Sequence, residues 1–298
     1  MLGYYAMFIA ATLLTQVNSV YIYKKYQLTA GTSLPASVLY MIINGIVSAI
    51  VPAIVIAATG AKFEFTTYSL IFAAATVICA AVSTILQFKA YEEGQIATVN
   101  IMVTIGGIVI PSLWGVLFLK EELSVQGMIG IVLMLCAVVL IMGKSGEKLN
   151  KKLVWMYLTM VLCACLVTML GKQHQIETRY ATVDTLSYSV WIGVVRTVLF
   201  AMLIPYLVKR DGKKVLKAEK APVVYATVSS VLSGGAYIVT LFTAAVLPVV
   251  ITSPLGTGIG ILMSSFLPWI TYHEKLEKKQ LWGVALSFVG VLVYLINM

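Results

Sequence analysis

Long apolar runs recur along the whole chain, and they constrain its fold more than any other feature. Each run has about 20 residues, the length that an α-helix needs to cross the hydrocarbon core of a bilayer. Charged residues make up only 11% of the 298 residues and hydrophobic residues make up 60%, whereas a soluble domain carries about 25% charged residues. We therefore expect an all-α membrane protein with about ten transmembrane helices.

The sequence also contains an internal repeat, in which the second half resembles the first. Two apolar runs between residues 91 and 142 meet at the charged hinge Lys120–Ser124, and a similar hinge recurs at His273–Leu276. A shift of 153 positions places Glu121 on Glu274 and brings several glycines into register. We expect a first repeat at 1–143, a basic connector at 144–152 and a second repeat at 153–298. Five helices per repeat would make the second copy enter the membrane in the opposite sense, an inverted repeat that is typical of transporters.

Lysine and arginine are distributed unevenly between the expected loops. The loops after helices 1, 3, 5, 7 and 9 hold 16 of them, and those after helices 2, 4, 6 and 8 hold 4. The positive-inside rule then predicts a multi-pass protein of the plasma membrane with both termini outside. The net charge of +9 needs no nucleic-acid partner, because the basic residues flank the expected spans.

Both repeats resemble the EamA domain of the drug/metabolite transporter superfamily, the second more weakly than the first. The resemblance rests on the run Lys89–Ala97, a helix with Pro111, and the hinge 119–124 followed by Gly127 and Gly130. It implies a ten-helix bundle whose cavity is lined mainly by helices 1, 3, 4, 6, 8 and 9, with helices 2 and 7 as gates. It also implies small organic solutes as substrates, such as amino acids, nucleotide-sugars, quaternary amines and drugs. Family members are commonly drawn with cytoplasmic termini, whereas the charge count here predicts the opposite, and we retain the charge count.

Arg196 lies near the middle of an expected helix at 183–208. An arginine there costs at least about 2.5 to 3.5 kcal/mol on insertion scales, so it needs compensation. One hypothesis is that its guanidinium binds a carboxylate or phosphate of a substrate. The alternative is a structural arginine that bonds carbonyls or tyrosines, or that reaches an interface. The expected spans contain no mid-membrane carboxylate to pair with it.

Polar side chains at helical spacing mark the first three expected helices, and further ones follow on helices 4 and 8. They either line a water-filled site or join helices by hydrogen bonds. The substrate-binding candidates are Arg196, Gln16, Asn44, Gln87, Asn100 and Tyr237. Trp191 or Tyr188 is expected to supply an apolar wall.

Glu121 and Glu274 occupy equivalent hinges, where we expect each carboxylate to cap the helix that follows it. Gly256 and Gly260 follow Pro254 in the ninth expected helix. These glycines either allow close helix packing or break the helix and expose its backbone to substrate.

No catalytic constellation, metal-ligand spacing or cofactor motif is evident, so we expect neither an enzyme nor a bound cofactor or metal. The sequence favours a secondary transporter that moves a small organic solute, an amino acid or another carboxylate metabolite, by alternating access. The rival functions are a multidrug or organic-cation exporter, a lipid-carrier flippase, and a membrane receptor or scaffold. Proton coupling and exchange both stay open.

Overall fold

The computed structural model describes the backbone of residues 1–31, 33–92, 96–142, 151–211, 220–272 and 278–295. Within these ranges the secondary structure is helical throughout, with no strand. The helices are α1 (Leu2–Val17), η1 (Asn18–Tyr23), α2 (Lys24–Ala30), α3 (Leu34–Thr59), α4 (Thr67–Glu92), α5 (Ile96–Phe118), α6 (Val125–Met142), α7 (Lys151–Ile176), α8 (Thr185–Ala201), α9 (Ile204–Asp211), α10 (Lys220–Ala244), α11 (Val249–Tyr272) and α12 (Lys278–Leu295). The expected all-α class is confirmed.

Six of these helical segments are long and apolar enough to cross a membrane, and four shorter apolar helices accompany them in the described residues. Many large apolar side chains on these segments are exposed, as on Ile54, Leu117 and Trp282. Such a surface suits lipid and not water, because lipid imposes no cost on exposed apolar groups. The chain therefore has the composition and helix lengths of a membrane protein.

Three helix boundaries expected from the apolar runs of the sequence are wrong. The first run indicates a helix end at about Tyr23, but a π-helical turn, η1, joins α1 to α2 and the helix runs on to Ala30. The sixth run indicates an end at about Gly171, whereas α7 continues to Ile176. The seventh is interrupted after Ala201, where α8 ends and the short helix α9 begins at Ile204.

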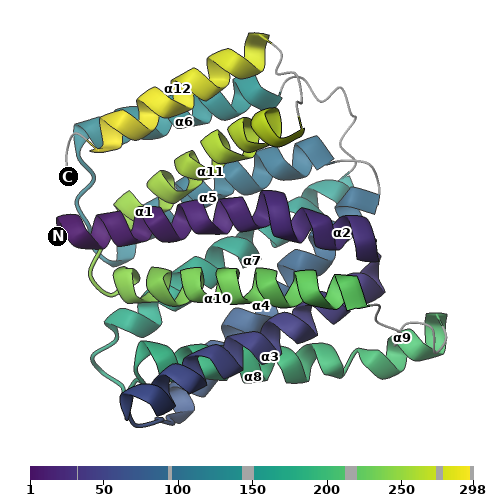
Figure 1. The fold of residues 1–298 in the computed structure, drawn as a ribbon. Helices are drawn as coiled ribbons and strands as arrows, with labels where there is room; N and C mark the ends of the chain where they lie inside the picture. The colour runs from purple at the N-terminus through teal and green to yellow at the C-terminus, as the bar shows by residue number, and fades with distance from the viewer. Residues whose placement is uncertain (32, 93–95, 143–150, 212–219, 273–277, 296–298) are drawn as a thin grey trace.

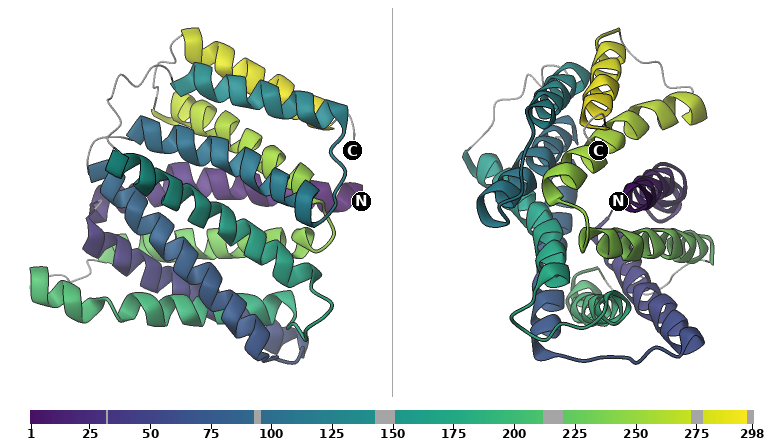
Figure 2. Two further views of the ribbon diagram at one scale, coloured as in Figure 1. Left: turned by 180° about the vertical axis from the view of Figure 1, so that it is seen from behind. Right: turned by 90° about the vertical axis from the view of Figure 1, so that its left-hand side faces the viewer.

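Helices from the two halves of the chain pack against each other in pairs. α3 lies on α8, α6 on α12, α5 on α11, α4 on α7 and α1 on α10. Figure 1 shows α6 and α12 along one side of the bundle and α3 and α8 along the opposite side, with the other helices between them. The start of α1 and the end of α12 lie at the same end of the bundle (Figures 1 and 2).

Glycine permits the closest of these approaches. A Cβ atom added at Gly193 of α8 would lie 2.7 Å from the carbonyl oxygen of Gly45 on α3, which no side chain could accept without a shift. Gly256 and Gly260 of α11 face α1, where added Cβ atoms would lie 3.2 Å from Phe8 Cζ and 3.1 Å from Gln16 Nε2. Because α11 is continuous past Pro254, close packing is the correct interpretation of these glycines and a broken helix is not.

Candidate solute-binding cavity

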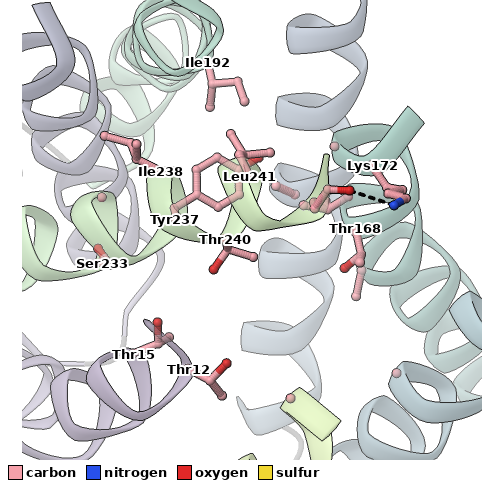
Figure 3. A pocket seen from close by; sticks show the side chains of 18 of the residues that line it. Thr12, Thr15, Thr168, Lys172, Ile192, Ser233, Tyr237, Ile238, Thr240 and Leu241 are labelled. Atoms are coloured by element: carbon pink, nitrogen blue, oxygen red, sulfur yellow. Dashed lines mark hydrogen bonds between the residues drawn. The ribbon is translucent and has the colours of Figure 1, made fainter. Parts of the chain in front are cut away.

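A cavity of about 920 Å³ lies inside the bundle. The six helices that the family resemblance implies, α1, α4, α5, α7, α10 and α11, all contribute to its wall. α3 and α8 contribute as well. Figure 3 shows hydroxyl-bearing residues from several helices around this space, among them Thr12, Thr15, Thr168, Ser233 and Thr240. The cavity is therefore shared by both halves of the chain and mixes polar with apolar lining.

Arg196 of α8 lines the cavity. Its Nη1 group donates a hydrogen bond to Asn44 Oδ1 on α3, and Asn44 Nδ2 in turn donates to Ser233 Oγ on α10 at 3.3 Å. The phenols of Tyr40 and Tyr237 are close enough to interact electrostatically with the guanidinium. No carboxylate is among the residues that line the cavity. A guanidinium carries five N–H donors, so the bond to Asn44 leaves most of its donor capacity directed elsewhere.

Lys172 of α7 is a second cation on the cavity wall, and only 6% of its surface is exposed. Its Nζ donates to the carbonyl oxygens of Ala244 and Leu247, both at 2.7 Å. These carbonyls lie at the C-terminal end of α10, where a helix carries partial negative charge. Glu121 Oε1 is 3.9 Å from the same Nζ. The ammonium group thus holds the end of α10 while facing the cavity.

Glu121 caps a helix, as expected, but the expected helix was wrong. Its Oε2 accepts a hydrogen bond of 2.8 Å from the backbone N–H of Val250, in the first turn of α11. The helix that follows the hinge, α6, is capped by Ser124, whose Oγ accepts from the Gly127 N–H at 3.0 Å. The Glu121 carboxylate therefore links the hinge of the first half to the second half, and it stabilises the N-terminal partial charge of α11. Glu274 lies outside the described residues.

The predicted binding residues are only partly brought together. Gln16, Asn44, Arg196 and Tyr237 all line the cavity. The side chains of Gln87 and Asn100 lie outside the described residues. The expected wall of Tyr188 or Trp191 is wrong, because Ile192 of the same helix takes that place.

Tyr188 and Trp191 belong instead to an aromatic cluster at one end of the bundle. Tyr188 stacks on His174, with ring centroids 3.7 Å apart and an interplanar angle of 10°. The indole Nε1 of Trp191 donates to the carbonyl oxygen of Glu64 at 3.1 Å. His174 is a buried residue of α7, and its Nε2 lies 2.8 Å from Ser69 Oγ. These contacts close the bundle between α4, α7 and α8.

Lys172 is the cavity residue that sequence reasoning missed. The polar run Lys172–Gln175 is typical of a helix end. The sequence therefore predicts that Lys172 lies in the loop after the sixth helix. Helical spacing carried a usable signal, since Cys165, Thr168 and Lys172 follow one another at three and four residues and share one face. All three line the cavity.

No family model matches the chain, and no curated protein matches it. Among solved structures, 28 chains match. One of them, described only as "Crystal structure of protein", covers 99% of this chain and 96% of its own, with a TM-score of 0.78 and 14% sequence identity. At that identity the similarity shows a shared fold alone. Fold and cavity together define the class of helical membrane proteins with an internal cavity of mixed polar and apolar lining.

Proposed function

We propose that the protein is a secondary transporter that moves a small organic solute carrying a carboxylate, by alternating access. The observation that carries this proposal is the cavity itself, which is shared by both halves. Its described lining includes two cations, Arg196 and Lys172, and no carboxylate. Its volume of about 920 Å³ falls in the range of about 300–1,000 Å³ that small-molecule sites occupy.

The pairing of helices supports an architecture of two inverted five-helix repeats. When the ten spans are numbered in order, helix 2 pairs with 7, 4 with 9 and 5 with 10, while 1 pairs with 8 and 3 with 6. Exchanging each helix for the one five places away leaves this pattern unchanged. A two-fold relation between the halves has that property, and it suits a solute site between repeats that rock against each other.

The two cations favour an anionic solute over an organic cation. A cation in this cavity would meet a net positive charge, because Arg196 and Lys172 contribute two positive charges and Glu121 beside Lys172 offsets one of them. An organic-cation exporter is therefore less well supported. Location in the plasma membrane and outside termini remain parts of the proposal, supported by the uneven charge of the connecting loops.

Transport by reconstituted protein tests the proposal. Proteoliposomes are screened with labelled amino acids, other organic acids and amines, and uptake is compared between wild type and R196Q. We expect uptake of a carboxylate solute, reduced about tenfold or more in R196Q because a hydrogen-bonded ion pair is lost. R179Q is the matched control, since Arg179 is an exposed loop residue. Unchanged carboxylate uptake in R196Q, or uptake of amines alone, would refute the proposal.

A further inference from the structure

Lys172 has one ammonium proton for which the described residues provide no acceptor. An ammonium group has three N–H donors, and two of them bond the carbonyl oxygens of Ala244 and Leu247. Glu121 Oε1, at 3.9 Å, is too distant for a hydrogen bond. Glu121 is also held in place, because its other oxygen accepts the N–H of Val250. The third donor of Lys172 is therefore available to an acceptor in the cavity.

The two cations lie at different levels along the same helix. Arg196 is tied through Asn44 to Ser233, and Lys172 is tied to Ala244. Both anchor points belong to α10, and at about 1.5 Å per residue they are roughly 16 Å apart along its axis. Tyr237, which interacts with Arg196, is roughly 10 Å from Ala244 by the same rise. The two cations are therefore anchored at well-separated levels of α10.

Mostly apolar side chains, together with Thr240, occupy the stretch between these two levels. Ile192, Ile238 and Leu241 line the cavity, and Figure 3 shows Leu241 between Tyr237 and Lys172. A solute that touches both cations would thus need an apolar or weakly polar body. Its length would match the spacing of roughly 10 to 16 Å.

Charge decides which group meets Lys172. Arg196 and Lys172 contribute two positive charges, and Glu121 beside Lys172 contributes one negative charge. The site therefore has one net positive charge, which a single carboxylate neutralises. A second carboxylate would lie close to Glu121 and leave an uncompensated negative charge, which is costly in a partly buried site. A neutral oxygen, as in a hydroxyl or amide group, accepts the free N–H of Lys172 without that cost.

We propose that Lys172 is a second, specificity-determining anchor of the cavity, so that the solute is an elongated monocarboxylate with a neutral oxygen acceptor at its far end. This inference rests on the proposed function, because it takes the carboxylate to bind at Arg196. Glu121 acts on specificity through Lys172, by supplying the charge that disfavours a second carboxylate.

Four probes of equal chain length test the assignment: octanoate, 8-hydroxyoctanoate, 8-aminooctanoate and suberate. Their eight-carbon chains span roughly 10 Å when extended. Binding to the protein in nanodiscs is measured by calorimetry, and binding to empty nanodiscs is subtracted. Wild type should bind 8-hydroxyoctanoate about tenfold more tightly than octanoate, because a hydrogen bond to a charged group is gained. It should bind 8-aminooctanoate more weakly than octanoate, because two ammonium groups would meet.

Three variants separate the role of Lys172 from that of Glu121. K172Q should bind octanoate and 8-hydroxyoctanoate about equally, whereas K172R should keep the preference and serves as the variant with its donors intact. E121Q retains an oxygen for the Val250 N–H but removes the negative charge, so it should shift the preference from 8-hydroxyoctanoate towards suberate. If K172Q does not fold, K172R and E121Q decide the matter by the same ratios.

Two results would overturn the assignment of Lys172. They are equal affinities of wild type for octanoate and 8-hydroxyoctanoate, and a ratio that E121Q leaves unchanged. Failure of the proposed function gives a different pattern, in which R196Q binds octanoate as tightly as wild type or no carboxylate binds at all. That pattern would overturn both proposals.

Discussion

At the scale of one residue, Tyr237 offers a hydroxyl group that is free to bind a solute. Its hydroxyl is buried and makes no hydrogen bond within the described residues, while the nearby hydroxyl of Tyr40 lies 3.0 Å from Ser229 Oγ. An unsatisfied buried hydroxyl costs about 1 to 3 kcal/mol of stability. Such a group next to Arg196 is suited to a carboxylate, because it can donate to an oxygen that the empty protein does not provide.

Replacing Tyr237 by phenylalanine should therefore have opposite effects on stability and binding. We expect Y237F to raise the thermal unfolding midpoint of the empty protein, since the unsatisfied hydroxyl is removed, and to weaken octanoate binding several-fold. Y40F is the matched control, and it should lower the midpoint because it removes a bonded hydroxyl. A lower midpoint in Y237F would mean that the hydroxyl has a partner in the protein.

Glu177 makes stability depend on pH at the end of α7. The backbone N–H of Arg179 donates to its Oε1 at 2.7 Å, and this bond is the main reason that the pKa of Glu177 lies below its ordinary value of 4.5. Bonds from Gln173 and the Thr178 N–H lower that pKa further. A carboxyl whose pKa is lowered by folding contributes stability above its unfolded pKa and loses that contribution as the pH falls through its folded pKa.

Thermal unfolding of wild type and E177Q should accordingly differ at neutral pH and converge in acid. We expect wild type to be the more stable protein above about pH 5 and to lose this advantage as the pH falls below 4.5. The measurement is the unfolding midpoint between pH 3 and 7. E122Q, at an exposed carboxylate of the hinge, should follow the wild-type profile. A constant difference between wild type and E177Q at all pH values would contradict this account.

At the scale of secondary-structure elements, pairs of helices determine the packing. The crossing of α3 and α8 is the closest of those described above. Gly45 and Gly193 face each other there, and a Cβ on either would lie under 3.0 Å from the backbone of the other helix. Small residues at such a crossing let backbones meet and increase van der Waals contact, which is a main source of helix association in lipid. This crossing also carries the contact between Asn44 and Arg196.

We expect G193A to separate α3 from α8 and to lower the free energy of unfolding by about 1 to 3 kcal/mol, the usual cost of overpacking. G235A is the matched control in α10, where a Cβ would meet nothing within 4 Å. Alanine there should raise stability by about 0.5 to 1 kcal/mol, because glycine is the poorer helix former. Thermal or detergent unfolding compares the two. Equal effects of both substitutions would show that the crossing is not tightly packed.

Helix existence was predictable from the sequence, whereas helix ends and side-chain partners were not. Apolar runs of membrane length define α3 at Leu34–Thr59 without error, because lipid leaves a helix as the only favourable form for such a run. The polar run after Gly171 led to a helix end being predicted there, which is wrong, because polar residues can lie inside a span where they face a cavity. Glu121 shows the second limit. Its position at a helix start was readable, but its partner Val250 lies 129 residues away and depends on the tertiary fold.

At the scale of the whole molecule, part of the candidate site could be predicted from polar residues at helical spacing. Gln16, Asn44 and Tyr237 belonged to polar stripes, and polar residues in a membrane span turn inward because lipid offers them no hydrogen bonds. The contacts of Lys172 and Glu121 could not be predicted, because they depend on how the two halves pack together. These contacts tie the hinge after α5, the end of α7 and the connection between α10 and α11 at one end of the bundle.

The charge of the connecting loops predicts the orientation of the whole molecule. The structure places Lys172 inside α7, but Lys24, Lys25, Lys151 and Lys152 of the more basic set also lie inside helices, so the expected orientation rests on the sequence count of 16 against 4. The positive-inside rule then predicts outside termini. Alkaline phosphatase, which is active only outside the cytoplasm, should be active when fused after Met298 and inactive when fused after Met142, the end of α6. A fluorescent protein that folds only in the cytoplasm should give the reverse pattern at the same two sites. Activity of phosphatase after Met142 together with its absence after Met298 would place both termini in the cytoplasm and show that the charge count does not set the orientation of this chain.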